Sequence, residues 1–457
     1  MLGAKEFTKL LRANWHLAIL SMLVIVTLMA YLSWLFKTNL VYGIDGPYYL
    51  LQIKSILKSG SMKYPDPPLF FYLSALASYL VGDIILGFKL TLALMLALAG
   101  IPLALTIELI TKSRIAMFVS YIAFSYSAYT FRLAGDLVKN TCGLLFVFLC
   151  IFFIVKCLFK PNYRGSILAA ISLCLVGLTH ILDFLIALAI SVLAPMIAFL
   201  LEKAKFKSHE LKLKPFAPIY IVLILVVILG SLTPIMGGDM GKVLSFIKSL
   251  GSTPPMQHLP PWGLISITFL IIGVFITMDS IIRKSESKSL ICMSMVMVIM
   301  SLIFNAYPLI PHNFMWRISL MNVIPVSYFS GCVIGKLKDQ RTLVLAAVAL
   351  LILAPIVLNG ISMANVIRPT ITSAEAQEII HVGETLPAGG CLLVPKVPLR
   401  YWTEYLLDSP VFSKISEAIS SGYRPIILLI EKGERHPPAK PFFLGSWIEA
   451  YFLTVRS

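Results

Sequence analysis

The sequence predicts a polytopic α-helical membrane protein that ends in a small external α/β domain. The chain has 457 residues, of which 58% are apolar and only 13% are charged, and its mean hydropathy is +0.88. Soluble domains carry roughly 25% charged residues. The apolar residues also form long continuous runs, which a single signal peptide does not explain.

The transmembrane helices are predicted from eleven apolar runs of about 15 to 24 residues, close to the roughly 20 that cross a bilayer as a helix. They occupy most of the chain as far as Asn359. The runs cover residues 16–36, 84–107, 115–130, 141–158, 165–181, 184–201, 215–235, 262–280, 289–307, 318–335 and 342–362.

The orientation follows from the loops, because lysine and arginine gather in alternate ones. The richest clusters lie near the N-terminus and at 156–164, 202–214, 283–288 and 336–341. The positive-inside rule places these segments in the cytoplasm, so the N-terminus is predicted inside and the C-terminus outside. This count requires that Leu69–Val81, at 13 residues, does not span. We interpret it as an interfacial or re-entrant helix within an external loop at 37–83.

The tail differs in composition, which divides the chain into a transmembrane domain at 1–365 and an extracytoplasmic domain at 366–457. Acids, prolines and short β-type runs replace the long apolar ones. Alternating patterns predict a compact α/β unit. The expected elements are helices near 374–383 and 411–420 and strands at 391–394, 425–431 and 450–455.

Several function classes are disfavoured by the sequence. The seven cysteines form no CxxC pair, zinc-type spacing or disulfide framework. No GxxxxGK[ST] loop is present, which argues against ATP hydrolysis by this chain. The net charge of +16 reflects the loop lysines, so no nucleic-acid partner is predicted.

The outer face of the predicted transmembrane domain carries aspartates and no glutamate. These are Asp45, Asp66, Asp83, Asp136, Asp183 and Asp239. Asp66 precedes two prolines and Asp83 follows a glycine, so both are expected to be ordinary turn residues.

Asp45 lies in the segment Tyr42-Gly43-Ile44-Asp45-Gly46-Pro47-Tyr48-Tyr49, just after the first run. An amphipathic stretch follows, with Leu50, Ile53 and Leu57 on one face and Gln52 on the other. A helix there would hold Asp45 at the membrane boundary, as a catalytic carboxylate or as an ordinary helix cap. Tyr48 and Tyr49 beside it are candidate substrate contacts.

These segments resemble the GT-C membrane glycosyltransferases, which include protein O-mannosyltransferases, lipid A aminoarabinose transferases and oligosaccharyltransferase catalytic subunits. The resemblance rests on the Asp45 segment, on Asp66-Pro67-Pro68-Leu69-Phe70-Phe71-Tyr72, and on the second external loop at 131–140. It implies a GT-C-like fold and a sugar donor linked to a polyprenyl (dolichyl-type) phosphate. It also implies that Asp45 acts as the base or orients the acceptor, consistent with the need to deprotonate an attacking hydroxyl.

Asp136 is the second catalytic candidate, as an acidic support or a metal ligand. The oligosaccharyltransferase type carries a paired DxD in this loop, whereas Gly135-Asp136-Leu137 has one acid. Mg²⁺ or Mn²⁺ can use one carboxylate with substrate oxygens. A metal-independent site is slightly favoured.

The leaving phosphate calls for cations, and few lie on the predicted outer side. Arg132 and Lys139 flank Asp136, and Arg317 begins a span, so these three are predicted to bind phosphate. The alternative for Arg317 is snorkelling to lipid headgroups beside Trp316.

Further candidates lie in other predicted loops and in the tail. His180 and Asp183 form an i, i+3 pair that would bind substrate or close a helical hairpin. The loop at 235–261, with Asp239 and His258, would cover the substrate or only connect two spans. In the tail, the aromatic residues around Glu404 would contact sugar or pack in a core.

The predicted function is an inverting glycosyltransferase of the plasma membrane with its active site on the extracytoplasmic face. It would transfer a sugar from a polyprenyl phosphate to a protein, lipid or glycan acceptor. The alternatives are a transporter or flippase for polyprenyl-linked sugars, and a catalytically inactive GT-C-like assembly subunit.

Overall fold

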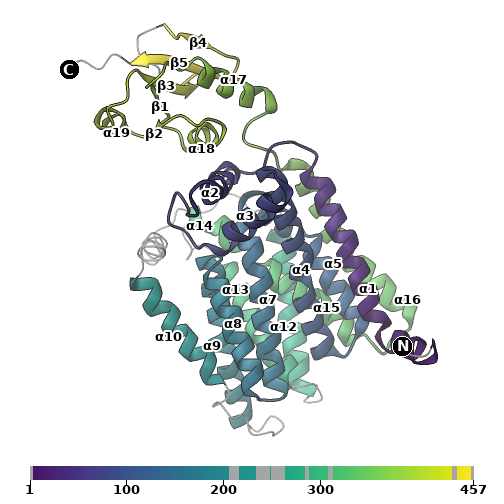
Figure 1. Ribbon diagram of the computed structural model, residues 1–457. Helices are drawn as coiled ribbons and strands as arrows, with labels where there is room; N and C mark the ends of the chain where they lie inside the picture. Colours follow the sequence, from purple (N-terminus) through teal and green to yellow (C-terminus); the bar gives the residue numbers. More distant parts are fainter. Residues whose placement is uncertain are drawn as a thin grey trace. The chain divides into compact units, whose positions relative to one another are not determined.

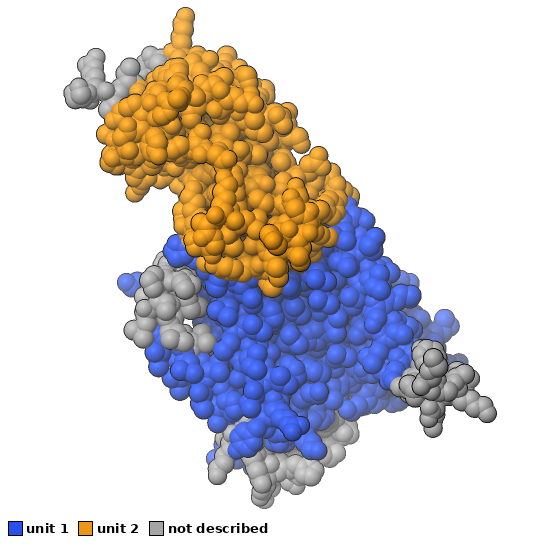
Figure 2. Space-filling model, viewed as in Figure 1, with its two compact units in different colours: residues 1–34, 65–70, 92–366 blue, residues 35–64, 71–91, 367–457 orange. Residues whose placement is uncertain are grey.

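The computed structural model describes residues 4–204, 216–232, 248, 263–283, 288–306, 312–434 and 440–453. The chain divides into two compact units (Figure 2). Unit 1 comprises Met1–Trp34, Pro65–Phe70 and Leu92–Val366, and unit 2 comprises Leu35–Tyr64, Phe71–Thr91 and Ile367–Ser457.

Unit 1 is a bundle of helices (Figure 1). Each of the eleven predicted runs overlaps at least one helix. The helices are α1 (Ala4–Leu35), the larger part of α4 (Ile84–Thr111), α5 (Arg114–Ser125), α6 (Ala128–Asp136), α7 (Val138–Phe159), α8 (Tyr163–Gly177), α9 (Ile181–Lys203), α10 (Ala217–Leu232), α12 (Gly263–Arg283), α13 (Lys288–Phe304), α14 (His312–Leu320), α15 (Val323–Lys336) and α16 (Thr342–Val366).

Seven helical segments among the described residues are long and apolar enough to cross a membrane, consistent with a multi-pass membrane protein. They are Asn14–Leu35, Ile84–Thr111, Val138–Phe159, Ile181–Lys203, Gly263–Arg283, Phe314–Lys336 and Thr342–Val366. The apolar helices α5, α8 and α13 are shorter. The count of eleven spans and the orientation therefore stay predictions.

The run at 115–130 is broken, whereas the sequence predicted one continuous span. Helix α5 ends at Ser125, and Ser127 caps α6 by accepting a hydrogen bond from the Thr130 amide at 3.2 Å. Serine competes for backbone hydrogen bonds and so favours a new helix start over continuation.

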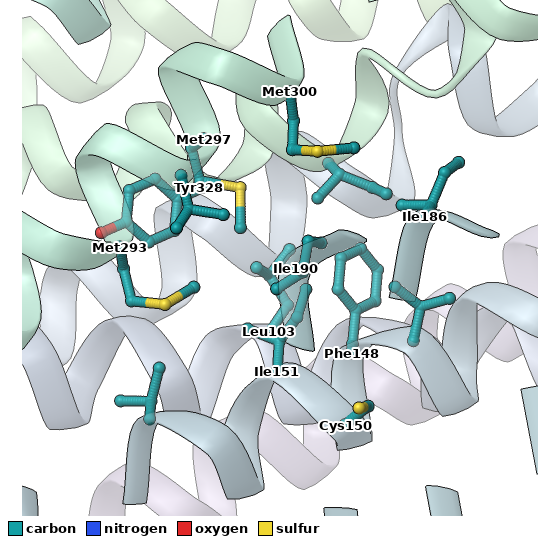
Figure 3. Close-up of a cluster of buried hydrophobic side chains, with 14 of the residues drawn as sticks. Leu103, Phe148, Cys150, Ile151, Ile186, Ile190, Met293, Met297, Met300 and Tyr328 are labelled. Atoms are coloured by element: carbon teal, nitrogen blue, oxygen red, sulfur yellow. The ribbon is translucent and has the colours of Figure 1, made fainter. Parts of the chain in front are cut away.

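The core of unit 1 forms where α7 packs on α8 and α9, α5 on α15, and α13 on α9 and α12. Figure 3 shows the central apolar side chains, including three methionines of α13, Met293, Met297 and Met300. Their spacing of four and three residues puts them on one helix face. Phe124 and Phe148 meet edge to face with ring centroids 5.1 Å apart.

Unit 2 combines the first loop with the C-terminal segment. The loop contributes α2 (Gly46–Ser59) and most of α3 (Leu69–Val81). The C-terminal elements are α17 (Ser373–Glu384), β1 (Cys391–Leu393), α18 (Val397–Leu406), β2 (Val411–Phe412), α19 (Ile415–Ser420), β3 (Ile426–Glu431), β4 (Phe443–Leu444) and β5 (Ile448–Leu453).

The sheet of unit 2 has the order β2-β1-β3-β5-β4. Strand β1 is parallel to β2 and β3, and β5 is antiparallel to β3 and β4. The α/β character of the tail is therefore confirmed. The helix expected at 411–420 begins with β2, and α18 was not predicted. The boundary at 365/366 stays a proposal, as does the interfacial position of α3, which exposes Leu76, Tyr79 and Leu80.

Candidate functional site

The polar cluster in unit 1 starts where α6 ends and α7 begins. Arg132 and Asp136 lie one turn apart on α6, and Nε of the arginine is 2.6 Å from a carboxylate oxygen. The side chain of Asp136 is 11% exposed. This ion pair uses one donor of a guanidinium that has five.

The pair bears on the predicted metal site, because the Asp136 carboxylate already faces a cation. Among the described residues, no group of three or more His, Cys, Asp or Glu side chains is arranged to hold a metal ion. The arrangement at Asp136 fits an ion pair better than Mg²⁺ or Mn²⁺ coordination.

Asp66 and Lys139 form a second ion pair, although the sequence suggested an ordinary turn residue at Asp66. Lys139 Nζ lies 2.6 Å from Oδ2 of Asp66, and both side chains are about nine-tenths buried. The prolines around Asp66 keep this segment extended. The Leu69 amide then donates to the Leu178 carbonyl at 2.9 Å, which attaches the segment to the end of α8. The turn interpretation of Asp66 is wrong.

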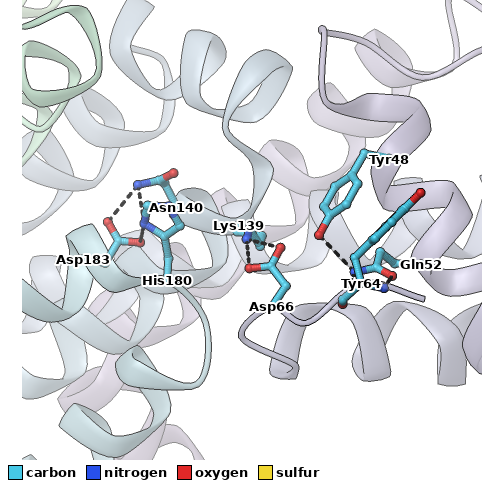
Figure 4. Close-up of polar contacts among 8 residues, drawn as sticks. All are labelled: Tyr48, Gln52, Tyr64, Asp66, Lys139, Asn140, His180 and Asp183. Carbon is cyan, nitrogen blue, oxygen red and sulfur yellow. Dashed lines mark hydrogen bonds and ion pairs between the residues drawn. The ribbon is translucent and has the colours of Figure 1, made fainter. Parts of the chain in front are cut away.

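Asn140 connects His180 and Asp183, as Figure 4 shows. Its Nδ2 donates to Oδ1 of Asp183 at 3.3 Å and lies 2.9 Å from Nδ1 of His180. Because Nδ2 is a donor, His180 Nδ1 accepts, and the neutral ring holds its proton on Nε2. The predicted contact between His180 and Asp183 is confirmed at 3.7 Å.

Asp183 is completely buried in the first turn of α9. Its Oδ2 makes no hydrogen bond within the described residues. The carboxylate fits against α7 because residue 143 is glycine, where a Cβ atom would lie 2.1 Å from Oδ2. A helix N-terminus favours negative charge, which offsets part of the cost of burying this carboxylate.

These residues lie at the end of unit 1 where the first turns of α7 and α9 meet. The cluster holds the cations Arg132 and Lys139 with three carboxylates and His180. Cations and helix N-termini suit phosphate oxygens, and carboxylates suit sugar hydroxyls. The cluster therefore combines the two kinds of group that a sugar phosphate site requires.

Arg317 lies in the last turn of α14, which packs on α6 and α13. Its side chain is exposed, and the guanidinium carbon lies 5.2 Å from the centroid of the Trp316 ring. This cation–π contact agrees with the snorkelling alternative and leaves phosphate binding as a prediction.

Asp45 lies in unit 2 at the N-cap position of α2, and Pro47 in the first turn favours the helix start. Its side chain makes no capping hydrogen bond, so the cap alternative is borne out in position only, and the catalytic role stays a prediction. Half-buried, it precedes Gly46, where a Cβ atom would lie 2.7 Å from Val41 Cγ2. The close approach of Val41 therefore requires glycine directly after the aspartate.

The predicted apolar face of α2 is confirmed in part. Leu50 and Ile53 are buried, but Leu57 is 40% exposed. Gln52, expected on the polar face, is completely buried and hydrogen-bonds the backbone N–H and C=O of Tyr64. The hydrogen bonds to Tyr64 explain why an amide replaces an apolar residue here.

The two predicted tyrosine contacts differ in their surroundings. Tyr49 is 3% exposed and stacks on Phe88 with centroids 6.1 Å apart, so it belongs to the packing of unit 2. Tyr48 is half-buried and lies against Tyr64 and Tyr401, with centroid distances of 6.0 and 5.3 Å. Tyr48 is the better candidate for contact with substrate.

The sequence suggested no role for Asn140, indicated only a turn at Asp66, and singled out the aromatic neighbours of Glu404 and not its carboxylate. Asn140 follows Lys139 directly and precedes the apolar run at 141–158, which was the only indication in the sequence. The predicted loop at 235–261, with Asp239 and His258, lies outside the described residues apart from residue 248.

Comparisons with known proteins give a match in structure only. No family model matches the sequence, and no curated protein matches it. ArnT from Cupriavidus metallidurans, in a crystal structure with undecaprenyl phosphate bound, matches with a TM-score of 0.51 and 11% identity over 96% of this chain and 98% of that one. The arabinofuranosyltransferase AftD from Mycobacteria matches with a TM-score of 0.52 and 12% identity over 89% of this chain, which spans 35% of AftD. The chain therefore has the fold of the GT-C membrane glycosyltransferases.

Proposed function

We propose that the protein is an inverting membrane glycosyltransferase that takes a sugar from a polyprenyl (dolichyl-type) phosphate. The observation that carries the proposal is the match over nearly the full length of both chains to ArnT, whose structure contains undecaprenyl phosphate. The acceptor is a hydroxyl of a protein, lipid or glycan on the external face of the plasma membrane.

In the proposed reaction, Asp45 takes the proton of the acceptor hydroxyl as its oxygen attacks the anomeric carbon. The bond between that carbon and the phosphate oxygen breaks, and polyprenyl phosphate leaves from the opposite side. Attack opposite the leaving group inverts the configuration.

Charge develops on the departing phosphate, so catalysis requires preorganised cations and donors. We assign this role to Arg132, Lys139 and Arg317, with His180 donating from Nε2. Asp66 and Asp136 hold Lys139 and Arg132 at ion-pair distances of 2.6 Å, which limits their rotamers before substrate binds.

The test is transfer from radiolabelled polyprenyl phosphate sugars by purified protein, with and without EDTA. We expect Asp45→Asn to lower turnover by about 10²- to 10⁴-fold, the usual contribution of a general base, while the protein stays folded. The matched control is Asp339→Asn, which changes an exposed turn aspartate and should leave turnover unchanged. Near-normal turnover in Asp45→Asn would remove Asp45 from the mechanism.

The same assay separates the alternatives. EDTA-sensitive transfer would make Asp136 a metal ligand and overturn the ion-pair interpretation. Saturable donor binding without turnover would indicate an inactive assembly subunit. Movement of the labelled lipid across the bilayer of vesicles that contain the protein, without loss of its sugar, would indicate a flippase.

A further inference from the structure

Helix α18 packs against α2, the helix of the first loop, and both helices belong to unit 2. Lys54 of α2 donates to the Tyr405 carbonyl at 2.6 Å, and Lys58 lies 2.6 Å from Asp408. Hydrogen bonds from Lys58 and then Lys54 hold the pKa of Asp408 below its ordinary value. Two turns of α2 are thus attached to the end of α18.

Glu404 is the buried centre of this contact. Its side chain is 4% exposed, accepts hydrogen bonds from Lys63 Nζ at 2.7 Å and Tyr64 Oη at 3.1 Å, and lies 3.5 Å from Arg400 Nε. A carboxylate is expensive to bury unless partners surround it. Apolar packing alone would not require an acid here.

Tyr64 connects Glu404 with the start of α2 through a series of hydrogen bonds. Burial raises the pKa of Tyr64, and the charge of Glu404 raises it further, so the hydroxyl stays a donor. The backbone of Tyr64 is hydrogen-bonded to the Gln52 side chain, and the Gln52 amide also donates to the Tyr48 hydroxyl at 3.0 Å. Tyr48 is three residues from Asp45.

A second attachment lies just before Asp45. The Gly43 amide donates to the Arg368 carbonyl at 3.3 Å, and Gly43 forms a parallel bridge with Pro369. The segment around Asp45 is therefore held from both sides by residues that follow the transmembrane bundle in sequence.

We propose that Glu404 is a positioning residue that fixes α2, and thereby the Asp45 carboxylate, through Lys63 and Tyr64. The proposal rests on the proposed function, in which Asp45 is the base. It makes the C-terminal segment part of the catalytic apparatus, although it supplies no group that touches substrate in this scheme.

The test compares Glu404→Gln with Glu417→Gln, which changes an exposed glutamate on α19 of the same unit. Three quantities are measured in the full-length protein: hydrogen exchange of 46–59, kcat for sugar transfer, and the Kd for undecaprenyl phosphate. In Glu404→Gln we expect faster exchange in α2 and a kcat about 10²-fold lower, the scale of a 1 Å misplacement. The Kd should stay within about twofold, and Glu417→Gln should match the wild type in all three.

Tyr64→Phe keeps the ring and removes one hydrogen bond to Glu404, so it provides a milder variant if Glu404→Gln does not fold. It should lower kcat less than Glu404→Gln and again spare the Kd. Unchanged exchange in α2 would overturn the attachment, and faster exchange with normal kcat would overturn the positioning role. A wild-type protein without transfer would overturn the proposed function itself, a result distinct from both.

Discussion

Lys139 and Asp66 have a contact that neither residue's local sequence requires. They are 73 positions apart, yet both are about nine-tenths buried and paired at 2.6 Å. A buried ion pair contributes little net stability, but removing one partner leaves an uncompensated charge. Variants of the two residues can therefore distinguish a role in folding from a role in binding.

We expect Asp66→Asn and Lys139→Met each to destabilise unit 1 by about 3 kcal/mol, and the double variant to unfold at a temperature closer to wild type. Binding of undecaprenyl phosphate should be lost whenever Lys139 is absent and kept in Asp66→Asn. Lys414→Met, in the exposed pair with Glu417, should cost about 0–1 kcal/mol. Normal lipid binding by Lys139→Met would exclude Lys139 from the phosphate site.

His180 offers a test of its assigned tautomer. Glutamine can place an amide N–H near the position of Nε2, whereas asparagine reaches only the region of Nδ1. We expect His180→Gln to keep the wild-type Kd for undecaprenyl phosphate within a few-fold, and His180→Asn to weaken it about tenfold, the value of one hydrogen bond. Equal losses in both variants would contradict a donor at Nε2.

Among the elements, α16 packs closely against the break between α5 and α6. Helix α16 packs against both, and a Cβ atom at Gly360 would lie 1.9 Å from the Tyr126 carbonyl oxygen. The Trp34 indole donates to the Ala364 carbonyl at 2.9 Å, one turn further along α16. Moving the backbone at the break would cost free energy, because it would disturb the hydrogen bond by which Ser127 caps α6.

Gly360→Ala should therefore destabilise unit 1 by about 1–3 kcal/mol, the usual cost of overpacking, despite alanine's higher helix propensity. Thermal unfolding in detergent measures this change. Ser362→Ala, an exposed position on the same helix, should stay within about 0.5 kcal/mol. A stabilised Gly360→Ala protein would mean that the helices separate easily at this contact.

Element boundaries were predictable where the signal is local. Asp83 was expected at a turn, and it accepts a hydrogen bond from the Leu86 amide at 2.6 Å at the start of α4. Leu69–Val81 was expected as a 13-residue helix and is one. Gln52 was missed because its hydrogen bonds reach Tyr64, outside α2. The break after Ser125 was missed although the Ser127 cap is a local signal, because the apolar run continues across it.

Two long helices of unit 1 run from the polar cluster to a lysine at their other end. Helix α7 begins near Lys139 and carries Lys156 in its last turn, about 25 Å away at 1.5 Å per residue. Helix α9 likewise runs from Asp183 to Lys203. The positive-inside rule predicts that Lys156 and Lys203 face the cytoplasm and that the polar cluster faces outward.

A reporter that is active only outside the cytoplasm should therefore be active when fused after Ser457 and inactive when fused before Met1. The reason is the excess of lysine and arginine in alternate loops. An inactive reporter at the C-terminus, together with an inactive one at the N-terminus, would mean that the chain crosses the membrane an even number of times. Leu69–Val81 would then be the first segment to reconsider as a span.

Hydropathy and charge are properties of the linear chain, so the sequence was sufficient to predict the membrane class, the helical runs and the α/β tail. The placement of the candidate acids on one side of the membrane stays a prediction. Which groups meet depends on the packing of the elements. Asp66 reaches Lys139 across 73 positions, and Lys63 reaches Glu404 across 341. Such pairings depend on how elements pack, and no local periodicity encodes them.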